Sequence, residues 1–222
     1  MKISLEKIGW FLISLAVPFF LLMTAIRVLI TPLYPEIEYR MPYFPEDSYG
    51  FSFDERMKWA KISIDYLVNN EGLEFLGDLR LADGQPLYIE RELSHMLDVK
   101  ILVKSMITAW IVLGVVMGLA GIASWRTGRL TASRAALGRG GTWTIGLIVV
   151  ILAGVAISFN WLFTAFHKLF FTGDSWLFLY SDSLIRLFPM VFWRDAFIWV
   201  GALTVLGALI LIWVGKGARE KV

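Results

Sequence analysis

The first residues of this chain to consider for catalysis are its two histidines, His95 and His167. The chain has no cysteine, which excludes a thiolate nucleophile, a disulfide and a cysteine-bound metal. Histidine is the side chain that can accept and donate a proton near neutral pH. The pair is therefore a candidate for general acid–base catalysis, and the alternative is that both are interfacial histidines beside lipid headgroups.

Side chains close to His95 in the sequence offer it several partners. Glu92 and Asp98 lie three residues before and after it, so on a helix either carboxylate could orient the ring. Ser94 is its direct neighbour, and neighbours on a helix point about 100° apart, so we reject a Ser94–His95 dyad. The chain contains no GxSxG, HExxH, phosphate-loop or dinucleotide-binding motif.

The elements that must position the histidines are membrane-spanning helices. Hydrophobic residues make up 57% of the 222 residues and the mean hydropathy is +0.65, more apolar side chain than a soluble domain of this length needs. A helix crosses the bilayer with about 20 apolar residues. We therefore expect an all-α integral membrane protein with a single membrane domain, 1–222. Its four expected spans cover about 8–30, 101–124, 143–163 and 196–214.

Basic residues predict the orientation of these spans. The segment 125–142 contains four arginines and no acidic residue, and the two ends of the chain contribute five more basic residues. By contrast, the segment 31–100 contains seven basic and fourteen acidic residues. We expect both termini and the loop 125–142 to be cytoplasmic. The loops 31–100 and 164–195 would then face outward.

The first outer loop is predicted to form a small extracytoplasmic layer of helix and hairpin. Asp54 is a candidate N-cap for a helix that ends near Asn69. Short apolar runs on both sides of an Asp-Gly turn signal predict a hairpin over 79–89.

A continuous helix is expected to carry His95 into the second span. No helix breaker occurs between Glu90 and Gly114. His95 would then lie six residues, or about 9 Å, outside that span, and His167 four residues beyond the third span. Both histidines are therefore predicted to lie in one thin layer at the outer interface.

Further candidates lie at the same depth. Arg27 is an ionisable residue near the outer end of the first span, where it is either functional or reaches to the headgroups. Arg186 is flanked by apolar residues in the second outer loop and is expected at headgroup level. The many aromatic residues of that loop, Trp176 among them, fit an interfacial belt and secondarily the wall of an acyl-chain groove.

The order of motifs along the chain resembles a known family. The motifs are ELSHMLDVK at 92–100, FHKLFF at 166–171, DSWLF at 174–178, DSLIRLFP at 182–189 and FWRD at 192–195. They are similar to those of the bacterial four-span membrane proteins that include the lipoprotein intramolecular transacylase, the Lit family. The resemblance covers essentially the whole chain, and the block from His167 to Asp195 is its most specific part.

The resemblance implies a reaction. Such an enzyme moves one acyl chain of a diacylglyceryl-modified lipoprotein from the glyceryl ester to the α-amino group of the N-terminal cysteine, which gives a lyso-form lipoprotein. His95 and His167 would act jointly, one taking a proton from the amine and the other assisting the oxyanion or the leaving alkoxide. The candidate substrate-binding residues are Arg186, Arg27, Asp98 and Trp176.

The resemblance also implies the setting of this reaction. We expect a multi-pass protein of the bacterial cytoplasmic membrane, in contact with phospholipids, with its active site on the extracytoplasmic side. No cofactor, metal or nucleic acid is expected. Two alternatives stay open at this point, a non-catalytic accessory protein of the bacterial envelope and a protein whose histidines are axial haem ligands.

Overall fold

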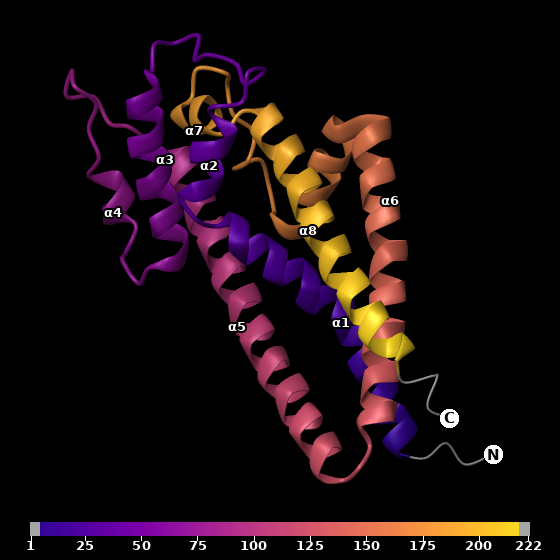
Figure 1. The fold of residues 1–222 in the computed structure, drawn as a ribbon. Helices are drawn as coiled ribbons and strands as arrows, with labels where there is room; N and C mark the ends of the chain where they lie inside the picture. The colour runs from indigo at the N-terminus through magenta and orange to yellow at the C-terminus, as the bar shows by residue number, and fades with distance from the viewer. Residues whose placement is uncertain (1–4, 218–222) are drawn as a thin grey trace. The chain divides into compact units, whose positions relative to one another are not determined.

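The computed structural model describes residues 5–217, and this part of the chain is helical without strands (Figure 1). Its helices are α1 (Leu5–Leu29), α2 (Leu33–Glu38), α3 (Phe53–Val68), α4 (Glu74–Gly77), α5 (Glu90–Arg126), α6 (Leu130–Phe170), α7 (Ser183–Leu187) and α8 (Met190–Lys216). Four of them, α1, α5, α6 and α8, are long and apolar enough to cross a membrane. The expected all-α protein with four spanning helices is confirmed.

The long helices extend beyond the predicted spans. Helix α5 begins at Glu90 and continues without a break to Arg126, as the absence of breakers predicted. Only 127–129 separate it from α6, so most of the expected loop 125–142 is helical. Gly128 has a φ of +71°, a backbone conformation that ends helices and that glycine adopts without strain. In the segment 130–137 that follows, six of eight residues are alanine, leucine or arginine, which favour helix.

The chain forms two compact units, which are described separately. Unit 1 consists of 1–27, 107–157 and 197–222, and unit 2 consists of 28–106 and 158–196. In unit 1, glycines bring helices into close contact. A Cβ at Gly140 would lie 2.5 Å from the Cβ of Val17, and one at Gly141 would lie 2.7 Å from the carbonyl oxygen of Ala208. Small residues of this kind are typical of contacts between membrane helices.

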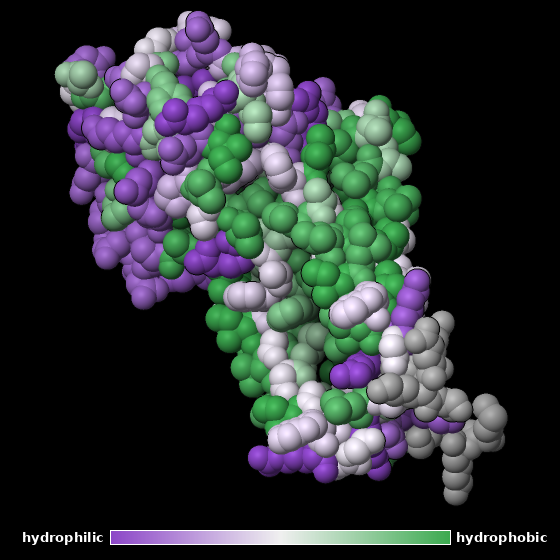
Figure 2. Space-filling model, viewed as in Figure 1, coloured by the Kyte–Doolittle hydropathy of each residue, from purple (hydrophilic) through white to green (hydrophobic). Residues whose placement is uncertain are grey.

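The surfaces of the elements differ in character (Figure 2). Hydrophobic side chains cover most of the visible surface along α6 and α8, whereas hydrophilic side chains predominate over α3 and α4. Beneath that surface, unit 2 has an apolar core drawn from its short helices and the first turns of α5 and α8. Its buried members include Tyr34, Tyr39, Trp59, Tyr66, Leu76, Leu87, Met96, Leu184, Leu187 and Phe192.

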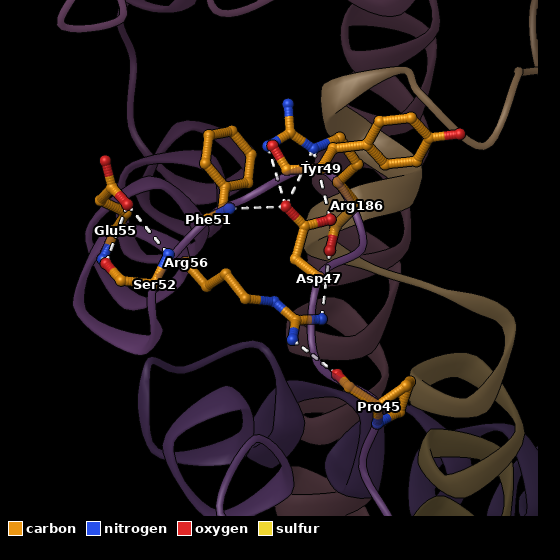
Figure 3. A network of polar contacts seen from close by, with 8 residues as sticks. All are labelled: Pro45, Asp47, Tyr49, Phe51, Ser52, Glu55, Arg56 and Arg186. Carbon is orange, nitrogen blue, oxygen red and sulfur yellow. Dashed lines mark hydrogen bonds and ion pairs between the residues drawn. The ribbon is translucent and has the colours of Figure 1, made fainter.

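Two local predictions in unit 2 are wrong. Ser52, not Asp54, is the N-cap of α3: its hydroxyl accepts the Glu55 N–H at 3.2 Å, and the Glu55 carboxylate accepts the Ser52 N–H at 2.9 Å (Figure 3). This reciprocal arrangement is a capping box. The expected hairpin is reduced to one antiparallel bridge between Arg80 and Pro86. Proline has no N–H to donate, so it cannot extend a ladder of strand pairs.

Candidate active site

The two histidines face each other within unit 2. Their ring centroids are 5.9 Å apart and the ring planes differ by 26°. His95 lies on the second turn of α5 and His167 on the last turn of α6, so the fold brings together residues 72 positions apart. Only 6% of His95 and 8% of His167 is exposed. The structure therefore joins the two residues into one buried imidazole pair.

Aromatic rings surround this pair. In the described part of the chain, five aromatic side chains have ring centroids within 5.7 Å of a histidine ring: Phe163, Phe166, Phe171, Trp176 and Phe178. Phe171 contacts both histidines, at 5.0 Å from His95 and 5.5 Å from His167. Apolar surroundings lower the local dielectric constant and so strengthen any hydrogen bond or charge interaction formed there.

A hydrogen bond sets the tautomer of His167. Its Nδ1 lies 2.8 Å from the carbonyl oxygen of Phe163, one helical turn earlier. A carbonyl oxygen can only accept, so Nδ1 carries the hydrogen and Nε2 of the neutral ring is free to accept a proton. The Nδ1 of His95 is buried and has no hydrogen-bond partner among the described residues. A hydrogen bond therefore fixes the tautomer of His167, and no such bond fixes that of His95.

Neither acidic neighbour of His95 forms the hydrogen bond that its spacing suggested. The Glu92 carboxylate accepts the Ile89 N–H at 2.8 Å and the Leu184 N–H at 2.6 Å, both from the backbone. Asp98 is half-buried and does not reach the ring through a hydrogen bond. Glu92 therefore binds backbone N–H groups and does not orient the His95 ring by a hydrogen bond. A role for Asp98 in substrate binding stays a prediction.

Arg186 belongs to a polar cluster with Asp47 (Figure 3). Its Nη2 lies 2.9 Å from Oδ2 of Asp47 and its guanidinium lies 3.5 Å from the Phe51 ring centroid. Burial raises the pKa of Asp47, but the hydrogen bonds from Arg186, the backbone N–H bonds from Phe51 and Tyr49, and the Arg186 charge together hold it below its ordinary value. Arg56 adds a bond to the Arg186 carbonyl at 3.1 Å. These contacts give Arg186 a structural role, and none of them is with a histidine.

The two remaining candidates differ in their positions. Trp176 lies beside His167, with ring centroids 5.1 Å apart, and its indole N–H donates to the Gly173 carbonyl at 3.1 Å. Arg27 lies in the last turn of α1, in unit 1. Trp176 is therefore placed at the imidazole pair, whereas the role proposed for Arg27 stays a prediction.

The aromatic enclosure is more specific than the interfacial belt expected from the sequence. Phe163, His167 and Phe171 follow one another at intervals of four residues, which places them on one face of a helix. That spacing was a signal that these rings would contact the histidine. Phe178 lies in a non-helical segment, where the sequence gives no regular spacing from which its contact with His95 could be predicted.

Four apolar helices of spanning length and a buried imidazole pair define a multi-pass membrane protein with a site suited to proton transfer. The sequence model of the family described as lipoprotein intramolecular transacylase Lit matches residues 11–193. The chain belongs to this family, which confirms the resemblance drawn from its motifs. It is accordingly an acyltransferase that acts on lipoproteins.

Individual relatives match nearly the whole chain. A protein of Aquifex aeolicus (strain VF5), described only as uncharacterized, is 28% identical over 215 residues, covering 95% of this chain and 94% of its own length. A solved structure of the membrane integral lipoprotein intramolecular transacylase Lit from Bacillus cereus gives a TM-score of 0.81 at 19% identity. That match covers 97% of this chain and 96% of the solved one.

A second structure of the Bacillus cereus protein, with one histidine replaced by arginine, gives a TM-score of 0.74 at 20% identity over 97% of this chain and 92% of that chain. At these identities the solved structures show a shared fold.

Proposed function

We propose that His95 and His167 together catalyse the transfer of an acyl chain from a diacylglyceryl ester to the α-amino group of the same lipoprotein. The observation that carries this proposal is the pair of buried imidazoles with centroids 5.9 Å apart. Transfer from an ester to an amine requires a group that accepts the proton of the amine and a group that protonates the departing alkoxide. Two adjacent imidazoles supply both.

The proposed reaction begins with loss of a proton from the α-ammonium group, whose ordinary pKa is about 7.7–8.0. Nε2 of one histidine accepts this proton, and the free amine attacks the ester carbonyl carbon. After the attack the nitrogen carries a positive charge, and the second histidine takes its excess proton. The carbon–oxygen bond to the glyceryl group then breaks, the alkoxide takes this proton from the second histidine to become a hydroxyl, and the first histidine returns its proton to water. The products are an amide on the cysteine and a lyso-glyceryl group. The tautomer of His167, with Nε2 free, supports this ring as the first acceptor.

The substrate itself lowers the entropic cost of this reaction. The amine and the ester belong to one molecule, so binding does not have to bring two reactants together. No acyl-enzyme intermediate is needed, which fits a site built from imidazole and aromatic rings. We propose that Trp176, beside His167, lines the path of an acyl chain.

The proposed setting is the bacterial cytoplasmic membrane, with both termini inside and the imidazole pair on the extracytoplasmic side. The excess of basic residues in 125–142 and at the chain ends supports this orientation. Arg27 is proposed as a contact for the lipid phosphate, and Asp98 as a contact for the lipoprotein. The same kind of role was expected for Arg186. For Arg186, its ion pair with Asp47 offers a competing structural explanation.

The test is mass spectrometry of the N-terminal peptide of a lipoprotein, produced with and without this chain. Because both rings are buried, and not exposed at an interface as the sequence suggested, His95→Gln and His167→Gln are preferable to alanine variants, which remove more packed volume. Each is expected to slow formation of the lyso-form by about 10²–10⁴-fold at normal abundance. Ser94→Ala, at an exposed neighbouring position, is the active control.

Two outcomes would contradict the proposal. A glutamine variant that reaches wild-type abundance and still converts the diacylglyceryl form at the wild-type rate would show that its histidine is not catalytic. Loss of activity in Ser94→Ala alone would require a covalent acyl-enzyme mechanism in place of direct attack by the amine.

A further inference from the structure

The Glu92 carboxylate lies one helical turn before His95 and connects two elements of unit 2. We infer that Glu92 is a positioning residue: it holds the segment 178–184 against the start of α5 and so keeps the Phe178 ring on His95. The inference rests on the proposed function, because it concerns the geometry of the same imidazole pair.

Glu92 is a buried side chain that binds two backbone segments. Only 1% of the residue is exposed. Oε2 accepts the N–H of Ile89, the residue directly before α5, at 2.8 Å. Oε1 accepts the N–H of Leu184, in the first turn of α7, at 2.6 Å. One side chain therefore satisfies backbone donors at the beginnings of two helices that are far apart in the sequence.

A second connection runs beside the first. Arg91 pairs with Asp182 at 2.7 Å, and the same carboxylate oxygen of Asp182 accepts the Leu179 N–H at 2.8 Å. The segment 178–184 is thus tied to the first turn of α5 through Leu179, Asp182 and Leu184.

The residue at the beginning of this tied segment is Phe178. Its ring centroid is 5.4 Å from that of His95, with the ring planes 64° apart. The Arg91 guanidinium lies 5.6 Å from the same ring. The position of Phe178 against the imidazole therefore depends on a segment that Glu92 and Asp182 hold in place.

Glutamine cannot replace Glu92 in this arrangement. A carboxylate presents two acceptor oxygens, whereas an amide presents one oxygen and one NH₂ donor. One of the two backbone N–H groups would face a donor, and a buried N–H without an acceptor is unfavourable. The segment 178–184 is therefore expected to shift. A displacement of about 1 Å at a catalytic site can slow a reaction by roughly 10²-fold.

The chain allows a direct test, because it contains only two histidines. Full-length protein with isotopically labelled histidine gives NMR signals from two imidazole rings. Glu92→Gln is expected to shift the His95 ring signals, through the displaced Phe178 ring, and to slow lyso-form production by up to about 10²-fold. Asp182→Asn should shift the same signals, and the double variant should lose less rate than the two separate losses combined.

The matched control is Glu90→Gln, the same substitution at an exposed position on the same helical turn. It should leave both the ring signals and the rate at wild-type values. Equal shifts in Glu90→Gln and Glu92→Gln would overturn the inference in favour of a general charge effect. Unchanged ring signals in folded Glu92→Gln protein would also overturn it, whether or not the yield of folded protein fell.

The outcomes separate this inference from the proposed function. If wild-type protein formed no lyso-lipoprotein while Glu92→Gln still shifted the His95 signals, the proposed function would fail and the positioning role would stand. If wild-type protein were active and Glu92→Gln changed neither signals nor rate, the positioning role would fail alone.

Discussion

The ion pair between Arg186 and Asp47 determines what a substitution at Arg186 measures. The two side chains are only 11% and 3% exposed, so water screens their interaction little. Nε and Nη2 of the guanidinium both bond to the Asp47 carboxylate, and the Phe51 ring covers the guanidinium face (Figure 3). A cation engaged in this way contributes mainly to the stability of unit 2.

We predict that Arg186→Gln lowers the free energy of unfolding by about 3–5 kcal/mol, because it removes the cation that binds the buried Asp47 carboxylate directly. The rate of lyso-form production per folded molecule should stay near the wild-type value. Denaturant unfolding of the purified protein and mass spectrometry of the product measure the two quantities. Arg40→Gln is the control, because its pair with Glu36 is exposed and should contribute about 0–1 kcal/mol. A lower rate with unchanged stability would instead place Arg186 at the substrate.

At the scale of elements, α2 is fastened to the segment 187–195 by buried polar groups. The Tyr39 hydroxyl donates to the Leu187 carbonyl at 2.7 Å, and the Tyr34 hydroxyl donates to the Phe192 carbonyl at 2.7 Å. Glu38, with no exposed surface, faces Asp195, and neither of its oxygens has a donor among the described residues. Protonation of Glu38 gives the buried carboxyl group a hydrogen-bond partner, because its O–H can donate to the Asp195 carboxylate.

This arrangement predicts a pH dependence of stability. Burial, followed by the contact with Asp195, raises the pKa of Glu38 from 4.5 to about 7. Between these values the unfolded chain has lost the proton and the folded chain keeps it, so the stability contribution is complete below about pH 4.5. It then falls as pH rises, by at most about 1.4 kcal/mol per pH unit, and levels off above about pH 7.

The measurement is thermal unfolding between pH 5 and 8 for wild type and Glu38→Gln. The variant keeps a donor toward Asp195 and cannot ionise, so the loss of stability with rising pH that Glu38 contributes should be absent from its profile. Glu36→Gln, at an exposed position of the same helix, should keep the wild-type slope. An unchanged slope in Glu38→Gln would show that this carboxyl group does not carry the dependence.

The elements that could be predicted from the sequence are those with a strong local signal. The start of α5 at Glu90 followed from the absence of breakers before Gly114. The cap of α3 was misplaced because Ser52 and Asp54 are both suitable residues, and only Ser52 has a glutamate three positions later.

The approach of His95 and His167 was predicted only from their expected common depth, which assumed continuous helices. Helix α5 is continuous, whereas α6 is interrupted at Ser158 (φ −161°, ψ 95°) before it reaches His167. Whether two helices turn their histidines toward each other depends on packing between distant segments, such as the contact of Phe171 with both rings. The bonds from Glu92 to Leu184 and the contact of Glu38 with Asp195 have the same long-range origin.

At the scale of the whole molecule, the proposed site and the glycine contacts between helices belong to different units. Unit 2 contains the imidazole pair, the Arg186–Asp47 pair and the bonds of Glu92. Unit 1 contributes apolar helix segments in contact through glycine. The residues that carry the proposed reaction therefore all belong to unit 2.

The orientation of the chain in the membrane gives the last prediction. A reporter active only in the cytoplasm should function when inserted at 127–129 or fused after Val222, and should fail when inserted at 82–85. The reason is the concentration of arginines in 125–142 against the acidic segment 31–100. The structure selects these insertion sites: 127–129 is the short connection between α5 and α6, and 82–85 is an exposed turn.

A reporter active only outside the cytoplasm should give the reciprocal pattern, which controls for fusions that fail to express. Activity of the cytoplasmic reporter at 82–85 would show that the orientation is opposite to the predicted one. The loop 31–100 and the imidazole pair would then lie on the inner side. The α-amino group of a translocated lipoprotein could not reach them there, so the proposed reaction depends on this result.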